Sequence, residues 1–329
     1  MPHVTPADIE AATRAALTAH GASPDVAASV AHATADSEAH GNTICGLSYV
    51  ESYCAALDTG RVDGSATPQV SQPRPGAVMV DAAKGFAQPA FAAGLDTAVA
   101  AARQNGIASL AVAHSHTCTS LGYFTAQIAA QGLIGIGFTN ASPVVAPPGG
   151  TKAVLGTNPI ALSVPGADGA LAIHFDSSTS AAALGAIKEA KEAGTQIPVG
   201  WCVDAEGQPT TDPAEALKGT ILPLGGAKGF GFGVMAEIMA SALTGSVNSL
   251  DVAGLKLGDG PPHDLGQFYI LIDPATHGPA WTDRIARLAG AVSEQDGARL
   301  PGSARAPMAE VNVPDALWSR IEALATPSA

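Results

Sequence analysis

Three glycine-rich or polar segments have residue types and spacing that suit chemistry. The first is the glycine-rich run 223–233, which contains Lys228 and leads directly into a stretch with helical character. Glycines let a backbone approach a ligand closely, and the N–H groups at a helix start, beside a lysine, suit a phosphate or a carboxylate. A glycine-rich turn followed by a closely packed helix explains the same run, so both interpretations stay open.

The other two segments follow apolar stretches. Segment 114–120 reads His-Ser-His-Thr-Cys-Thr-Ser after the apolar stretch 107–112, and segment 139–159 contains two turns rich in Asn and Thr. Because α/β sheets bind ligands at the carboxyl ends of their strands, these side chains can supply an acid, a base or anchoring hydrogen bonds. A hydrogen-bonded loop is the structural alternative. The two histidines lack an evident third ligand, so we predict no metal site.

The composition indicates a compact globular protein. Of the 329 residues, 47% are hydrophobic and 14% are charged, which excludes a disordered chain or a coiled coil. With 16 Lys and Arg against 29 Asp and Glu, the net charge of -13 disfavours nucleic acid or an anionic membrane as a partner. The apolar stretches are far shorter than the roughly 20 residues of a membrane helix, and the four cysteines form no CxxC pair. We therefore expect a cytoplasmic protein with reduced thiols.

Alternating apolar and helical stretches predict an α/β protein with helices at both ends of the chain. Thr5-Pro6 and Ser23-Pro24 indicate two opening helices, which end near Gly21 and Gly41. The turn-rich stretch 59–75 indicates a boundary. Beyond it we expect strands at 77–80, 107–112, 133–139, 160–164, 170–175 and 268–272, and helices at 89–104, 124–131, 181–193, 231–243, 281–293 and 314–323.

Motifs that would identify a common enzyme class are missing from the sequence. No GxGxxG lies between a strand and a helix with an acidic residue about 20 positions later, as a Rossmann fold requires. There is also no GxxxxGK[ST], HExxH or GxSxG, which removes the simplest arguments for a nucleotide triphosphatase, a zinc peptidase or a serine hydrolase.

Eight short segments occur in a fixed order: GFAQPA at 85–90, TNASP at 139–143, PPGG at 147–150, LGTNPIA at 155–161, FDSSTS at 175–180, IPVGW at 197–201, GGAKG at 225–229 and RLPG at 299–302. In this order and spacing they resemble the malate/L-lactate dehydrogenase family. Its members reduce 2-oxo acids or cyclic 2-imino acids with a nicotinamide cofactor and do not use a Rossmann fold. The resemblance extends from about residue 5 to residue 325.

The resemblance implies a fold, a cofactor and an assembly. The fold is a non-Rossmann α/β nicotinamide-binding fold, in which residues 1–75 and 275–329 form a helical subdomain and residues 76–274 form the α/β body that binds cofactor and substrate. The relatives favour NADPH over NADH, and they are typically homodimers with the site near the subunit interface. The residues implied to hold the cofactor are Thr117, Cys118, Thr119, Ser120, Leu121, Thr157, Asp176, Ser177, Ser178, Lys228 and Arg299.

The chain departs from the family where the family supplies its acid. The usual Ser-His-Gly-Leu-x-Arg, with a proton-donating histidine, its serine partner and a carboxylate-binding arginine, is here Ile-Cys-Gly-Leu-Ser-Tyr at 44–49. An aspartate that some imine-reducing relatives have is replaced by Ala186. Cys45 and His116 are therefore the candidate proton donors, and Tyr49 and Ser48 the candidate substrate-binding residues.

The missing histidine favours an imine over a ketone as the substrate. Ketone reduction creates an alkoxide that needs a proton, and general acid catalysis contributes about 10²- to 10⁴-fold. A cyclic imine can arrive as an iminium that already carries its proton. We therefore expect an NAD(P)H-dependent reductase of Δ1-pyrroline-2-carboxylate or Δ1-piperideine-2-carboxylate that makes a cyclic L-amino acid. The alternatives are a 2-hydroxyacid dehydrogenase of the malate, lactate or sulfolactate type, and a cofactor-binding protein that has lost catalysis.

Overall fold

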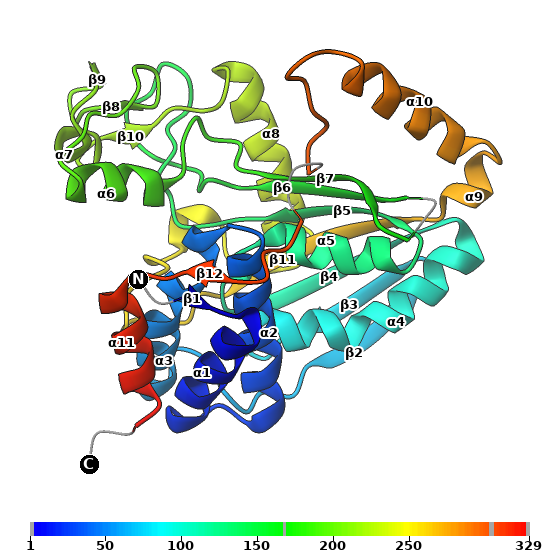
Figure 1. Cartoon of the computed structure of the whole chain (residues 1–329), viewed down its shortest axis with the longest axis horizontal. Coiled ribbons are helices and arrows are strands. Elements are labelled where there is room, and N and C mark those ends of the chain that lie inside the picture. Colours follow the sequence, from blue (N-terminus) through cyan, green and yellow to red (C-terminus); the bar gives the residue numbers. More distant parts are fainter. Residues whose placement is uncertain (1–2, 167–168, 303–305, 327–329) are drawn as a thin grey trace.

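A computed structural model describes residues 3–166, 169–302 and 306–326, and a seven-stranded mixed sheet lies at its centre (Figure 1). The strand order is β2-β3-β4-β11-β5-β6-β7. β3 and β4 are parallel, whereas the other neighbouring pairs are antiparallel. The strands are β2 (Gln69–Arg74), β3 (Ala77–Asp81), β4 (Ile107–Ser115), β5 (Ile134–Thr139), β6 (Ile160–Pro165), β7 (Leu171–Ser177) and β11 (Leu265–Ile272).

The strand order differs from that of a Rossmann fold. β4, the helix α5 (Leu121–Ala130) and β5 follow one another in the chain, but β11 lies between the two strands and is antiparallel to both. A Rossmann sheet is mostly parallel and binds the dinucleotide where its strand order reverses. The α/β fold without a Rossmann topology, which the sequence predicts, is therefore confirmed.

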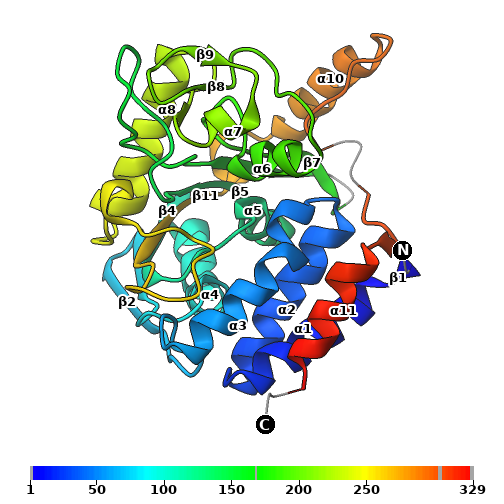
Figure 2. The ribbon, with the colours of Figure 1, turned by 90° about the vertical axis from the view of Figure 1, so that its left-hand side faces the viewer.

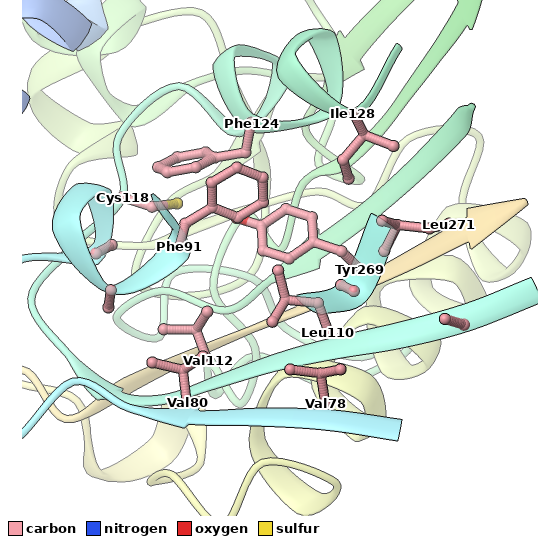
Figure 3. Close-up of a cluster of buried hydrophobic side chains, with 14 of the residues drawn as sticks. Val78, Val80, Phe91, Leu110, Val112, Cys118, Phe124, Ile128, Tyr269 and Leu271 are labelled. Carbon is pink, nitrogen blue, oxygen red and sulfur yellow. The ribbon is translucent and has the colours of Figure 1, made fainter. Parts of the chain in front are cut away.

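The main core lies between the sheet and the two helices α4 (Ala87–Asn105) and α5. Figure 3 shows the rings of Phe91, Phe124 and Tyr269 grouped above the valines of β3 and β4. The Phe91 ring centroid lies 5.0 Å from that of Phe124 and 4.9 Å from that of Tyr269, both in edge-to-face geometry. Such pairs add stability beyond the burial of apolar area, so they hold α5 firmly on the sheet.

Four helices form a separate layer beside the sheet: α1 (Pro6–Ala19), α2 (Pro24–Ala39), α3 (Val50–Asp58) and α11 (Asp315–Leu324). Thr5 and Asp8 form a capping box at the start of α1, and Ser23 caps α2, as the sequence predicts. β1 (His3–Val4) pairs with β12 (Val311–Asn312), which joins the two ends of the chain. Figure 2 shows α11 beside α1.

A third group of short elements lies on the opposite side of the sheet from these helices (Figures 1 and 2). It has its own apolar core, in which Val145, Ile187 and Ile221 are buried. Its members are β8 (Cys202–Val203), β9 (Pro209–Thr210), β10 (Thr220–Ile221), α6 (Leu184–Glu192), α7 (Pro213–Ala216) and α8 (Ala227–Glu237), which continues as the π-helical turn η3 (Ile238–Ala242).

Two elements differ in place from the sequence expectation. The prediction of turns over 59–75 is wrong for 69–74, which form the edge strand β2. All six residues of β2 are exposed, so they show no alternation, and an edge strand tolerates Pro73.

The helix α10 (Trp281–Ser293), which follows the short α9 (Pro274–His277), contacts β7 and lies far from α1 and α11 in Figures 1 and 2. The division into a subdomain of residues 1–75 and 275–329 and a body of 76–274 stays a prediction.

Candidate functional site

The turn after α2 contains two 3-10 segments, η1 (Thr43–Cys45) and η2 (Leu47–Tyr49), which carry three of the predicted site residues. The buried carboxylate of Glu38 accepts a hydrogen bond from the Leu47 N–H at 2.7 Å. A Cβ at Gly46 would collide with the same carboxylate, so glycine is required between the two segments. Glu38 and Gly46 thereby determine the path of the chain through Cys45 and Ser48.

The Cys45 thiol is protonated and weakly acidic. Burial and the nearby charge of Asp176 raise the pKa of Cys45 to about 12, against smaller opposing effects of a hydrogen bond with Asn42 and of the Lys256 ammonium. Burial also raises the pKa of Tyr49. Both groups are neutral at pH 7, and neither is an efficient acid for an alkoxide.

His116 lies inside the protein with only 2% of its surface exposed. Its ring stacks on that of His263 with centroids 3.7 Å apart, and the rings of Tyr53 and Phe86 contact it edge-on. Burial, followed by the charges of His263 and Arg61, lowers the pKa of His116 well below its ordinary value. His116 is therefore neutral at pH 7, and its role as a proton donor stays a prediction.

The predicted cofactor residues 117–121 form the turn that enters α5. Thr117, Cys118 and Leu121 are buried, whereas Thr119 and Ser120 are partly exposed. Figure 3 shows Cys118 close to Phe124 in the main core. Thr119 and Ser120 are therefore the two residues of this turn whose side chains are most accessible to a ligand.

Asp176 connects the end of β7 to the start of α5. Its Oδ2 accepts a hydrogen bond from the Gly122 N–H at 2.7 Å. Helix N-termini stabilise a carboxylate, and once one is present a second anion there is disfavoured. The Asn42 amide donates to Ser120 Oγ at 3.4 Å, so the residue that precedes η1 also meets the start of α5. η1, β7 and α5 thus converge around Cys45.

The remaining serine and threonine candidates lie where residues 177–180 meet the loop before α8. The Thr179 N–H donates to the Thr157 carbonyl at 2.9 Å, and the Leu224 N–H donates to the Thr179 carbonyl at 2.9 Å. These bonds place Thr157 and Ser178 beside residues 223–226. The Ser177 and Ser178 hydroxyls donate to backbone carbonyls nearby, and both residues are partly exposed.

The start of α8 fits a phosphate group. Gly225 and Gly226 have φ of 62° and 70°, with open space where a Cβ would lie. No side chain caps this helix, and the described part of the chain supplies no acceptor for the N–H groups of residues 227–229. Lys228 is exposed beside them. Unpaired N–H groups and a lysine at a helix start are the donors that hold the phosphates of a dinucleotide.

Arg299 is exposed in the segment that follows α10. Two residues later, the Pro301 carbonyl accepts a hydrogen bond from the His174 N–H at 3.1 Å. A Cβ at Gly302 would collide with His174, so this segment lies tightly against β7. The structure therefore places Arg299 near the strand that carries Asp176.

Lys256 reaches the site from a loop that no sequence motif marks. Its Nζ lies 4.3 Å from the centroid of the Tyr49 ring and donates to the carbonyl and hydroxyl oxygens of Ser48, at 3.1 Å in each case. It is 208 residues away from Ser48 in the chain, and no motif surrounds it. Only the fold reveals that Cys45, Ser48 and Tyr49 share their surroundings with an ammonium group.

Comparison with known proteins identifies the family. The sequence profile described as malate/L-lactate dehydrogenase matches residues 4–321. The chain belongs to this family. A Δ1-pyrroline-2-carboxylate/Δ1-piperideine-2-carboxylate reductase of Pseudomonas putida is 39% identical to this chain over 300 residues, covering 91% of this chain and 88% of the relative. A (2R)-3-sulfolactate dehydrogenase (NADP+) of Chromohalobacter salexigens is 36% identical over 291 residues, covering 88% of this chain and 87% of the relative.

A solved structure of the malate/L-lactate dehydrogenase family supports the same assignment. The Δ1-piperideine-2-carboxylate reductase of Pseudomonas syringae pv. tomato superposes with a TM-score of 0.92 at 34% sequence identity, over 98% of this chain and all of the other. The chain is accordingly an NAD(P)-dependent oxidoreductase with the fold of this family. The individual roles of the candidate site residues stay predictions.

Proposed function

We propose that the chain reduces a cyclic 2-imino acid, Δ1-pyrroline-2-carboxylate or Δ1-piperideine-2-carboxylate, to the cyclic L-amino acid with NAD(P)H. Reductases of these two compounds are among the similar proteins in both comparisons. The observation that carries the proposal is Cys45. At the position where the family has a histidine donor, this chain has a thiol whose pKa is raised to about 12.

The residues around Cys45 suit a substrate that brings its own proton. An iminium carries that proton and a positive charge, so its reduction to a neutral amine needs no acid from the protein. The bound cofactor supplies the hydride, which adds to the C2 carbon of the substrate. The Asp176 carboxylate, whose charge contributes to the raised pKa of Cys45, favours a cationic nitrogen nearby. The Cys45 thiol, with its raised pKa, stays protonated and neutral near that place.

The cofactor contacts that we propose follow the donors described above. Lys228 and the N–H groups of residues 227–229 hold a phosphate, while Thr119, Ser120 and Ser178 face the cofactor from the turns at α5 and β7. We propose NADPH as the preferred cofactor, with NADH as the weaker one. The support is the relative whose name specifies NADP+. A fluorescence titration with each cofactor tests the preference directly.

Reduction of a sulfonated 2-oxo acid is the second candidate function. The similarity to a sulfolactate dehydrogenase favours it, as do the two lysines Lys188 and Lys256. Burial, and after it the charge of the nearby Lys188, lowers the pKa of Lys256. A dianionic substrate would match two cations. Because ketone reduction needs a proton, this candidate requires Cys45 or His116 as the donor.

Product analysis tests the proposal. The protein with NADPH and Δ1-pyrroline-2-carboxylate should yield L-proline, and with Δ1-piperideine-2-carboxylate L-pipecolate, as resolved by chiral chromatography. Formation of 3-sulfolactate from sulfopyruvate, with no amino acid from either imine, would favour the second candidate. Tight NADPH binding without any product would indicate a protein that has lost catalysis.

A homodimer is the assembly that we propose. Phe232, Ile238, Leu243 and Leu250 are each at least half exposed, and they lie in α8, in η3 and in the segment that follows η3. Several large exposed apolar side chains within about twenty residues of the chain are a feature of protein interfaces. Light scattering should give about twice the chain mass of 32.6 kDa, and Phe232→Asp should give the single-chain mass.

For its location we propose the cytoplasm. All four cysteines are free thiols, which is typical of a reducing compartment. In the described ranges, no helix combines the length and the apolar character needed to cross a bilayer. Detection of the tagged protein by cell fractionation tests this location.

A further inference from the structure

A 2-imino or 2-oxo acid carries a carboxylate, and position 49 of this chain does not supply the cation to bind it. Burial raises the pKa of the Tyr49 hydroxyl, so this side chain is neutral. A phenol can donate one hydrogen bond to a carboxylate, whereas a cation forms a stronger, charge-assisted bond. A carboxylate-binding cation must therefore come from another element if this site binds such substrates.

Lys256 is a cation in contact with both candidate substrate-binding residues. Its ammonium lies over the Tyr49 ring and donates two hydrogen bonds to Ser48. An ammonium has three N–H donors, so one more is available for a ligand. Lys256 is also exposed, which makes it accessible from solvent.

Charged groups of both signs lie around Lys256. Burial, followed by the like charge of Lys188 on α6, lowers the pKa of Lys256, while Cys45, Glu189 and Glu51 act in the opposite direction. α6 begins over η1, because a Cβ at Gly185 would lie 3.1 Å from the Ile44 side chain. Lys256 and the helix that carries Lys188 thus both lie close to the turn that contains Cys45.

The opposite charge also lies near Cys45. Asp176 is close enough to raise the pKa of the Cys45 thiol, and its carboxylate is anchored at the start of α5. An iminium carboxylate has complementary charges at its two ends. Such a substrate can place its carboxylate towards Lys256 and its nitrogen towards Asp176.

The loop that carries Lys256 is held by hydrogen bonds from two residues that follow α3, about 200 positions earlier in the chain. The Arg61 guanidinium, in a residue only 2% exposed, donates to the carbonyls of Gly254, Leu257 and Pro261, which lie on both sides of Lys256. Thr59 Oγ1 donates to the Gly258 carbonyl at 2.8 Å. A ligand-binding group needs such support to keep its geometry.

We propose that Lys256 binds the carboxylate of the substrate, in place of the arginine that the family has at position 49. This inference rests on the proposed function only in that the substrate is a small 2-carboxylate. It assigns a role to the 252–264 loop, which supplies the cation that lies over the Tyr49 ring. Lys188 adds positive charge at longer range.

The variants Lys256→Gln and Lys256→Arg test the proposal, with Lys218→Gln as a matched control that removes an exposed lysine paired with Glu215. With NADPH saturating, Lys256→Gln should raise the KM for Δ1-pyrroline-2-carboxylate about 10- to 100-fold, and the KM for NADPH should not change. Lys256→Arg should restore most of the loss. Turnover of Δ1-pyrroline, which lacks the carboxylate, should be equal in the wild type and Lys256→Gln.

An unchanged KM, an equal loss with Δ1-pyrroline, or a loss confined to kcat that arginine does not restore would overturn the proposal. The last result would indicate that Lys256 donates a proton. Thermal melting of each variant identifies misfolding, and Lys256→Met provides a second replacement that keeps the aliphatic stem over the Tyr49 ring.

Calorimetric binding of pyrrole-2-carboxylate, a planar analogue that cannot be reduced, separates this inference from the proposed function. The wild type should bind it and Lys256→Gln should bind it at least about tenfold more weakly, whichever 2-carboxylate is the true substrate. Equal binding by the two proteins would overturn the inference even if imines are reduced. Failure of the wild type to bind the analogue, with and without NADP+, would overturn it as well.

Discussion

Replacing Arg61 by methionine should release the loop that carries Lys256 while the rest of the fold is kept. The guanidinium lies near the end of α3, where its Nε donates to the Pro261 carbonyl at 2.8 Å and its Nη2 to the Gly254 carbonyl at 3.1 Å, with a further short bond to the Leu257 carbonyl. Methionine keeps most of the aliphatic stem but donates no hydrogen bond. The change therefore removes three bonds that converge on one loop.

The size of the effect follows from where the three acceptors lie. A hydrogen bond to a charged group contributes about 1.5–3 kcal/mol, which would give about 4.5–9 kcal/mol if all three carbonyls stayed buried. Leu257 and Pro261 are exposed, so their carbonyls can bind water once the arginine is gone. We therefore expect the free energy of unfolding to fall by about 2–4 kcal/mol.

Denaturant unfolding and amide hydrogen exchange measure this prediction. Exchange should accelerate in residues 252–264 and remain unchanged in the main core, and the KM for the 2-carboxylate should rise as it does for Lys256→Gln. The control is Arg74→Met, which removes an exposed arginine from β2. Unchanged exchange in 252–264, or acceleration spread evenly over the whole sheet, would refute the assignment of Arg61 as the anchor of this loop.

Three further predictions concern the candidate residues themselves. Cys45→Ala should change kcat for imine reduction by less than about threefold, because an iminium needs no acid; a loss of about 100-fold in the steady-state assay would show that the thiol takes part. Lys228→Ala should weaken NADPH binding about tenfold by fluorescence titration, and Lys218→Ala should not; equal affinities would remove the phosphate role. His116 and His263 are held neutral, the pKa of His263 being lowered to about 3, whereas the unfolded chain binds their protons from about pH 6.5 downwards. Protonation of His263 alone should therefore lower the free energy of unfolding by about 1.4 kcal/mol per pH unit as the pH falls from 6.5 towards 3, and His116 acts in the same direction. His263→Gln should flatten this slope in melts across that range; an unchanged slope would contradict the assignment.

Elements with a strong local signal could be predicted from the sequence. The strands at 107–112 and 133–139 are apolar runs that are buried in the sheet, and the opening helices have a proline and a capping residue at their starts. The strand β2 could not be predicted in this way. Its six residues are all exposed, so neither alternation nor hydrophobicity separates them from a turn.

The candidate site likewise contains residues that could be selected from the sequence and residues that could not. Lys228 could be selected because glycines and a helix start surround it in the sequence. His116 carries the residue type of a proton donor, but only the fold reveals that it is buried among aromatic rings and that this burial lowers its pKa. Lys256 could not be selected at all, because its relation to Ser48 depends on how two loops 208 residues apart come together.

The most direct test of the proposed function is the ratio of kcat/KM values for imines and 2-oxo acids with the same enzyme. Loss of NADPH absorbance should be followed with Δ1-pyrroline-2-carboxylate, Δ1-piperideine-2-carboxylate, pyruvate, oxaloacetate and sulfopyruvate at matched concentrations. Because Cys45 stands where the family has its histidine, we expect at least one imine to exceed every oxo acid by about 100-fold or more. An oxo acid that exceeds both imines would contradict this account and make the proton donor the next group to identify.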